Sequence, residues 1–210
     1  MDELVQDSDE TLTLLREAGT GDHRAFDQLL AQHRPELRRF VELRMDPRMR
    51  GRVDPSDVVQ ETQLEVFRRL PDFLERQPMP FHVWLHKTAY ERLLMARRQH
   101  LRAAQRAIGR EVPLPDRSSL VLAQRLLRPG STPSQRLSVR ELARRVYQVL
   151  AQMSDSDRTI LFMRNLEERS YQEIACILDI DPATARKRNG RALLRLHKLL
   201  VEDGLTDSQL

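Results

Sequence analysis

The stretch SYQEIACILDIDPATARKRNGRALLRLHKLL, residues 170–200, contains two helix starts separated by a short turn. Ser170 precedes Glu173 by three positions, which is the spacing of a capping box in which each side chain accepts a backbone N–H of the other residue. Asp181 followed by Pro182 is a second start signal, because the carboxylate caps the helix and a proline at the first helical position loses no hydrogen bond. This spacing predicts a helix-turn-helix, in which the second helix enters the major groove of DNA.

The second helix of this stretch has a basic face with no acidic residue between positions 182 and 201. With residues placed about 100° apart, the side expected to face the core carries Ala185, Ala192, Leu193, Leu196, Leu199 and Leu200. The opposite side carries Thr184, Lys187, Arg188, Arg191, Arg195 and Lys198. The first four of these lie in the half of the helix that reaches bases, whereas the last two are expected to contact phosphates. A merely solvated face is the alternative, but such faces usually mix both charge signs.

The composition of the 210-residue chain restricts its class. The length allows one or two domains, each able to bury a core, and the formal net charge is +4. The single cysteine, Cys176, excludes an internal disulfide and a cysteine-based zinc site, and we expect it to be buried and inert. No apolar run approaches the length of a membrane span and the acidic N-terminus lacks a signal-peptide pattern, so we expect a cytoplasmic protein.

Helical periodicity extends along the chain without an alternating strand pattern, which predicts an all-α fold. A short helix is expected around 10–18 and a longer one over 24–45, which Pro35 should kink or break. A basic irregular loop should occupy 46–53. The next helix should begin after Asp54 and stop at Pro71, followed by a proline-bounded loop that extends to residue 80.

The helix after Asp54 has an apolar stripe and an acidic one. The apolar stripe consists of Val58, Val59, Thr62, Val66, Phe67 and Leu70. The acidic stripe consists of Asp57, Glu61 and Glu65 at four-residue intervals. The pattern alone does not decide between simple solvation of these carboxylates and the binding of a partner.

A further helix is expected from Phe81 to beyond Arg102. Its inward side should carry Trp84, Leu85, Thr88, Ala89, Met95 and Ala96, and its outward side should carry His86, Lys87, Tyr90, Arg97 and Arg98. A run of arginines without intervening acids consists of Arg92, Arg97, Arg98, Arg102, Arg106 and Arg110. Basic residues beside aromatic ones suit single-stranded nucleic acid, which is held by base stacking and by attraction to its backbone.

Residues 108–137 are rich in proline and serine and are predicted to be a linker. Ser138 and Glu141 form another capping box, opening a helix to about Met153, and Ser154 caps the helix that follows. The predicted organisation is therefore two helical domains, the second a helix-turn-helix domain, with these bounds: N-terminal extension 1–21, first domain 22–107, linker 108–137, second domain 138–204 and a frayed tail 205–210.

Together these segments resemble the extracytoplasmic-function class of bacterial RNA polymerase sigma factors. DVVQETQLEVFRRLPDF (57–73) followed by PFHVWLHKTA (80–89) resembles the domain of that family that binds polymerase and melts promoters. The stretch from LAQMSDSDRTILF to RALLRL (150–196) resembles its −35-binding domain. The resemblance covers about 22–106 and 137–200, which is most of the chain.

The resemblance implies a function and a set of site residues. The protein would direct core polymerase to promoters and help to open the strands, without enzymatic activity, cofactor or metal. The helix matching 57–67 would dock on the clamp helices of the β′ subunit through Asp57, Gln60 and Glu61. A flipped base of the −10 element would enter a pocket near 77–81, and the −10 contacts would come from Trp84, Lys87, Tyr90, Glu91, Arg97 and Arg98. The −35 contacts would come from Thr184, Arg186, Lys187, Arg188, Arg191 and Arg195, with Arg186 on the flank of the helix. Members of the family are often held by an anti-sigma factor.

Four residues depart from the family pattern. Asp179 stands where a helix-turn-helix often has glycine, although aspartate tolerates a left-handed turn better than most residues. Asn189 falls on the inward side where an aliphatic residue is usual, so it needs a hydrogen-bond partner. Gly190 should weaken its helix, and Glu91, where asparagine is common, should repel a phosphate.

Two other functions fit parts of the sequence. A stand-alone transcriptional regulator would share the helix-turn-helix but would not bind polymerase. A metalloenzyme is suggested by His82 and His86, which have the i, i+4 spacing of a helical metal pair, but no third ligand recurs nearby.

Overall fold

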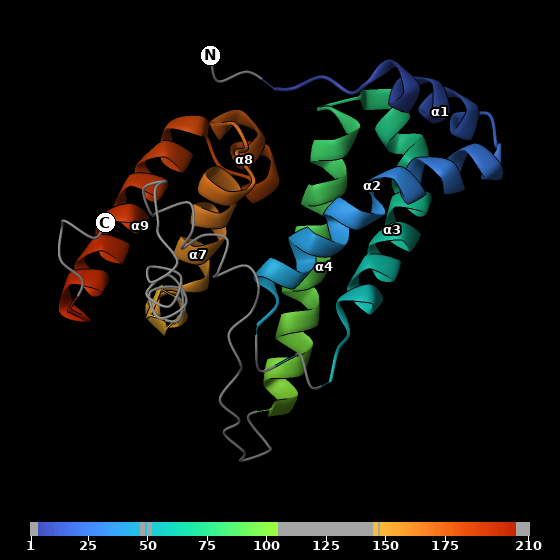
Figure 1. The fold of residues 1–210 in the computed structure, drawn as a ribbon. Coiled ribbons are helices and arrows are strands. Elements are labelled where there is room, and N and C mark those ends of the chain that lie inside the picture. Colours follow the sequence, from blue (N-terminus) through green and yellow to red (C-terminus); the bar gives the residue numbers. More distant parts are fainter. Residues whose placement is uncertain (1–3, 47–48, 50–51, 105–144, 147, 205–210) are drawn as a thin grey trace, which may run out of the picture. The chain divides into compact units, whose positions relative to one another are not determined.

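The computed structural model describes residues 4–46, 49, 52–104, 145–146 and 148–204, which form two compact units that are described separately here (Figure 1). Within these residues every regular element is a helix, which confirms the predicted all-α class. The proposed linker 108–137, the capping box at Ser138 and the tail 205–210 lie outside the described residues.

Among its described residues, the first unit contains four α-helices, α1 (Asp9–Gly19), α2 (His23–Arg44), α3 (Pro55–Arg76) and α4 (Phe81–Ala104). Helix α2 packs against α1, α3 and α4, and α3 packs against α4. The centre of this unit consists of fully buried apolar side chains, among them Leu29, Phe40, Val41, Val66, Phe81 and Leu85. Each of the first three helices begins at a residue whose side chain caps it, namely Ser8, Asp22 and Asp54.

Neither proline stops its helix: α2 continues through Pro35, which excludes a break there, and α3 continues past its predicted end at Pro71. A proline inside a helix costs about 3 kcal/mol. Burial of apolar side chains on both sides of each proline outweighs this cost, since each buried Leu or Phe contributes about 1.5–3 kcal/mol. In α2 these side chains include Leu37 and Phe40 after the proline, and in α3 Phe73 is only 5% exposed. The predicted loop over 71–80 therefore shrinks to residues 77–80.

Helix α4 differs from its predicted faces at two residues. His86 is fully buried, although it was expected outside, and its Nδ1 lies 2.7 Å from the carbonyl oxygen of His82. Residues 83–86 are all buried because α2 and α3 both pack on this part of the helix. Nearer its C-terminus, burial is reduced to the stripe of Leu93 and Ala96, which leaves Met95 47% exposed rather than inward.

The second unit contains helical residues at 148–152, then α7 (Asp155–Leu161), a π-helical turn η2 (Phe162–Leu166), α8 (Tyr171–Leu178) and α9 (Pro182–Glu202). Ser154 caps α7, as predicted, by accepting the N–H of Asp157. The core of this unit includes Leu150, Ile160, Met163, Ile174, Ala185, Ala192, Leu196 and Leu200. Leu193 was expected to face this core but is 37% exposed, because it lies at the edge of the buried stripe of α9.

Candidate functional site

The turn between α8 and α9 has the geometry of a helix-turn-helix. At the start of α8, the Ser170 N–H donates to the Glu173 carboxylate at 2.7 Å, and the Glu173 N–H donates to the Ser170 hydroxyl at 3.1 Å. At its end, Asp179 adopts a left-handed conformation with φ 55°, and the Ile180 N–H donates to the carbonyl of Ala175 at 3.0 Å. This is the pattern of a Schellman motif, so aspartate fulfils the role that glycine often has.

Helix α9 starts as its sequence predicts. Asp181 accepts the N–H of Thr184 at 2.8 Å and also the hydroxyl of the same residue. These two bonds lower the pKa of Asp181 below its ordinary value. The hydroxyl of Thr184 is therefore engaged in the cap of its own helix, and this side chain is only partly exposed.

Asn189 has the partners that its inward position requires. Its side chain is 4% exposed, and its Nδ2 donates to the Tyr171 hydroxyl at 3.1 Å. Its Oδ1 lies 3.4 Å from the Nδ2 of Asn165. The amide thereby links α9 to α8 and to η2.

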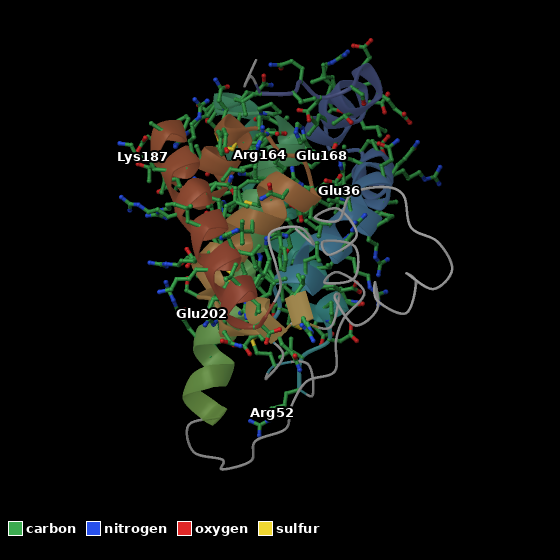
Figure 2. The ribbon with its side chains drawn as sticks, turned by 60° about the vertical axis from the view of Figure 1, so that its left-hand side comes forward. Glu36, Arg52, Arg164, Glu168, Lys187 and Glu202 are labelled. Carbon is green, nitrogen blue, oxygen red and sulfur yellow. The ribbon has the colours of Figure 1, made fainter. Side chains whose placement is uncertain are left out.

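The cations of α9 that are predicted to contact the −35 element fall into two groups. Lys187, Arg188 and Arg191 are exposed, and Figure 2 shows Lys187 projecting outward from α9. Two others contact their own unit. Arg186 lies over the ring of Tyr171, with 5.2 Å from Cζ to the ring centroid, and Arg195 donates from Nη1 to Asp157 at 2.6 Å. The expected flank position of Arg186 agrees with this contact.

The residues proposed for the −10 element all lie on α4 but differ in exposure. Arg98 is exposed, whereas Lys87, Tyr90, Glu91 and Arg97 are partly exposed. Arg97 lies 3.9 Å from the Asp46 carboxylate, which is 5% exposed, and Glu91 pairs with Arg69 of α3 at 3.1 Å. The carboxylate of Glu91 is therefore paired with a cation of the neighbouring helix.

Trp84 is a core residue in this structure. Its ring is 5% exposed and stacks on Phe73, with centroids 4.4 Å apart and an interplanar angle of 19°. A direct base contact would require this ring to leave Phe73. We therefore assign Trp84 to the support of α4 rather than to its DNA-facing side.

The sequence did not reveal a contact at the N-terminus of α4. The carboxylate of Asp7 accepts the N–H of Phe81 at 2.5 Å and the N–H of His82 at 3.2 Å, and it lies 2.9 Å from Nδ1 of the His82 ring. Burial raises the pKa of Asp7, but these bonds and the nearby His82 lower it further, so that the net shift is downward. The partners are more than 70 residues apart in the chain, so no local spacing pattern could have indicated this cap.

The acidic residues of α3 differ in whether they are exposed to solvent or paired with a neighbouring helix. Asp57, Gln60 and Glu61 are exposed, and Asp57 also accepts the N–H of Asp54 at 3.2 Å in a capping box. Glu65 differs from them because it pairs with Arg92 of α4 at 3.1 Å. Only the first part of the acidic stripe is therefore available to a partner.

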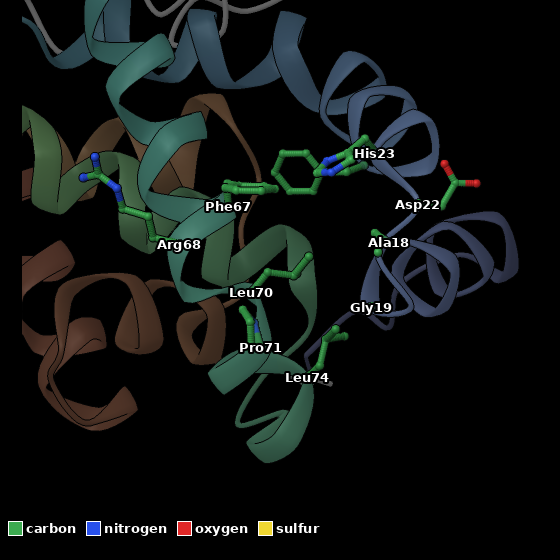
Figure 3. A pocket seen from close by; sticks show the side chains of 11 residues that line it. Ala18, Gly19, Asp22, His23, Phe67, Arg68, Leu70, Pro71 and Leu74 are labelled. Atoms are coloured by element: carbon green, nitrogen blue, oxygen red, sulfur yellow. The ribbon is translucent and has the colours of Figure 1, made fainter.

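Further along the same helix, Leu64 is 59% and Phe67 is 47% exposed, so Phe67 is not the core residue that its stripe predicted. Phe67 borders a pocket of about 410 Å³ between α3 and the junction of α1 and α2 (Figure 3). Its ring stacks on His23 and meets Phe26 edge-on, with centroids 5.9 and 5.2 Å away. At the other end of the pocket, a Cβ added to Gly19 would lie 2.7 Å from Leu74, so α1 approaches α3 closely there.

The two histidines that have the i, i+4 spacing of a metal pair make other contacts. His82 lies at Asp7, and His86 is buried beside Phe40, with ring centroids 4.9 Å apart. Across the part of the chain that the structure describes, His, Cys, Asp and Glu side chains do not gather in threes that could hold a metal. Cys176 is partly buried rather than fully so. No helix among the described residues has both the length and the apolar character needed to cross a membrane.

Comparison with known proteins identifies the second unit first. Residues 143–196 match the family Sigma-70, region 4, so the helix-turn-helix is that of a sigma factor. The ECF RNA polymerase sigma-E factor of Haemophilus influenzae is 27% identical over 179 residues, covering 85% of this chain and 89% of the relative. The RNA polymerase sigma-H factor of Pseudomonas aeruginosa is 26% identical over 201 residues, covering 94% and 96%.

Solved structures agree with this fold. The structure of CnrH in complex with the cytosolic domain of CnrY matches with a TM-score of 0.58 at 23% identity, covering 93% of this chain and 100% of that one. The sigma factor RpoE of Bartonella quintana, in complex with the anti-sigma factor NepR, matches with a TM-score of 0.56 at 21% identity, covering 83% and 96%. The chain is therefore similar over most of its length to RNA polymerase sigma factors, including one of the extracytoplasmic-function class, and its residues 143–196 carry the Sigma-70, region 4 match.

Proposed function

We propose that this protein binds core RNA polymerase in the cytoplasm, directs it to promoters through −35 and −10 contacts, and promotes strand opening without catalysing a reaction itself. The observation that carries the proposal is the extent of the likeness to sigma factors, which includes both helical units. A stand-alone regulator would need only the helix-turn-helix, and it gives no role to the exposed carboxylates of α3.

The −35 contacts are proposed to come from the exposed face of α9. Lys187, Arg188 and Arg191 are exposed without an intervening acid and lie in the half of the helix that reaches base edges. A guanidinium can pair bidentately with guanine in the major groove, whereas a lysine can bind a base or a phosphate. Arg186 and Arg195, which contact Tyr171 and Asp157, are better placed to contact phosphates at the edges of the site.

The −10 contacts are proposed to come from α4 and the short loop 77–80. Extrusion of a base costs a few kcal/mol of unstacking, and capture of the opened strand can offset this cost through stacking and phosphate contacts. Tyr90 is the partly exposed aromatic residue of the proposed set, and Arg98 is the exposed cation of that set. Strand opening in this mechanism is a matter of binding, since no covalent bond changes.

Polymerase docking is proposed on the exposed face of α3. Asp57, Gln60 and Glu61 supply polar contacts, and Leu64 and Phe67 continue the same stripe at helical spacing. A partner helix with basic and apolar side chains would complement this face. We also propose an anti-sigma partner, because the structurally similar RpoE was solved in complex with the anti-sigma factor NepR, and CnrH in complex with the cytosolic domain of CnrY.

The test is transcription in a purified system. The full chain is mixed with bacterial core polymerase and fragmented genomic DNA of its source, and the RNA chains are sequenced. We expect initiation at a defined set of sites that share a −35 and a −10 element. Core polymerase without the chain is the control. If the chain binds duplex DNA but neither associates with core polymerase nor starts RNA chains, the stand-alone regulator replaces this proposal.

A further inference from the structure

The N-terminal segment of the chain caps two different helices with adjacent residues. The hydroxyl of Ser8 accepts the N–H of Thr11 and caps α1. The carboxylate of Asp7 does not cap α1 but accepts two N–H groups at the start of α4. The side chain of Asp7 is only 7% exposed. It is therefore an internal part of the first unit rather than a solvated charge of a loose extension.

Helix α4 has no cap of its own. The carbonyl of Pro80 accepts the N–H of Trp84 at 3.1 Å, which places Pro80 at the N-cap position. A proline side chain has no acceptor, so the first N–H groups of α4 need a partner from elsewhere. Asp7 supplies it, and its negative charge also suits the positive end of the helix dipole.

The same turn is anchored on its other side by aromatic contacts. Phe81 is fully buried and meets His33 and Phe73 edge-on, at centroid distances of 5.5 and 5.9 Å. At the other end of the loop, Gln77 is left-handed with φ 38°, and its N–H donates to the carbonyl of Phe73 at 2.7 Å. Loop 77–80 is therefore held between a fixed helix end and a helix start that depends on Asp7.

We propose that Asp7 is a positioning residue for single-strand capture: by capping α4 it sets the geometry of loop 77–80 and the first turn of α4 against the opened −10 strand. This inference rests on the proposed function, because it concerns the same −10 contacts. It gives the segment before α1 a role in promoter opening, although that segment lies far in sequence from the residues that would contact DNA.

The experiment uses holoenzyme assembled from core polymerase and the full chain. The probe is a single-stranded oligonucleotide with the non-template −10 sequence of a promoter that the wild-type holoenzyme uses. Asp7→Ala removes the acceptor, Asp7→Asn keeps an acceptor oxygen without the charge, and Asp9→Ala removes a nearby exposed carboxylate as the matched control. We expect Asp7→Ala to weaken oligonucleotide binding about tenfold, Asp7→Asn to weaken it less, and Asp9→Ala to leave it unchanged.

Two further measurements separate positioning from general stability. Binding to core polymerase and to a duplex carrying the −35 element should stay at wild-type values in all three variants. If Asp7→Ala does not fold, Asp7→Asn alone decides the question by the same comparison with Asp9→Ala. Unchanged or tighter oligonucleotide binding by the folded Asp7 variants overturns the inference, as does a parallel loss of all three activities. A wild-type holoenzyme that starts no RNA would instead contradict the proposed function itself.

Discussion

Asn189 shows how a single polar residue is accommodated in a helix core. Its amide is buried and bonded to Tyr171 and Asn165, so its removal leaves both partners without this contact. We expect Asn189→Ala to lower the free energy of unfolding by about 1–3 kcal/mol. The neighbouring Gly190→Ala is the opposite case, because an added Cβ meets nothing within 4 Å. Gly190→Ala should raise the free energy of unfolding by about 0.5–1 kcal/mol. Denaturant unfolding of the full chain, followed by circular dichroism, measures both, and equal effects of the two substitutions would contradict this interpretation.

The capping aspartates predict a pH dependence of stability. Hydrogen bonds to the carboxylates lower the pKa of Asp54 and Asp181 from the ordinary value of 3.8. A group whose pKa is lower in the folded state stabilises the fold fully above its unfolded pKa, and this contribution is lost as the pH falls through the folded pKa. We therefore expect the denaturant concentration at the midpoint of unfolding to decrease once the pH is lowered below about 4. In Asp181→Asn, which cannot titrate at this position, the loss between pH 5 and the acid range should be smaller than in the wild type, and identical pH profiles would exclude a contribution from this cap.

Helix α4 carries two adjacent arginines for which the structure predicts different roles. Arg97 lies beside the buried carboxylate of Asp46, whereas Arg98 is exposed. We expect Arg98→Ala to slow open-complex formation, seen as weaker permanganate reactivity around −10, with unchanged unfolding. Arg97→Ala should instead destabilise the first unit, because it removes a cation from a buried carboxylate. If both variants lose DNA reactivity to the same extent at full stability, Arg97 is a DNA contact rather than a partner of Asp46.

At the scale of elements, helix starts that depend on neighbouring residues were predicted correctly, whereas features that depend on contacts between distant helices were not. The starts at Ser154, Ser170 and Asp181 were predicted because a cap depends on residues within one helical turn. The predicted end of α3 at Pro71 was wrong because the burial that stabilises the helix beyond this proline comes from contacts with other helices. His86 was misplaced for the same reason, since two helices pack against α4 where only one face was expected to be covered.

In the candidate sites, too, features within one helix were predictable and contacts between helices were not. The exposed basic face of α9 was predictable, because helical spacing and the absence of acids define it within one element. The contacts of Arg186 with Tyr171 and of Arg195 with Asp157 were not, because each joins two helices. Asp7 is the extreme case, since its partners belong to a helix that starts 74 residues later.

At the scale of the whole molecule, the proposed function requires that polymerase binding and −35 recognition can be lost independently. We expect Gln60→Ala with Glu61→Lys to abolish co-purification with core polymerase while leaving −35 duplex binding by the chain unchanged. Asp57 is left intact because it belongs to the capping box of α3. Asp27→Lys, a charge reversal at an exposed position of α2, is the control.

The reciprocal variant, Lys187→Ala with Arg191→Ala, should keep core binding and lose discrimination at the −35 element by about 1–3 kcal/mol for each base contact. Competition between promoter and scrambled duplexes measures that discrimination directly. An equal loss on both duplexes would show that these side chains contact phosphates, because a phosphate contact carries no sequence information. A loss of both activities in either variant would contradict the separation itself, since residues on two distinct helical units would then be acting through one surface.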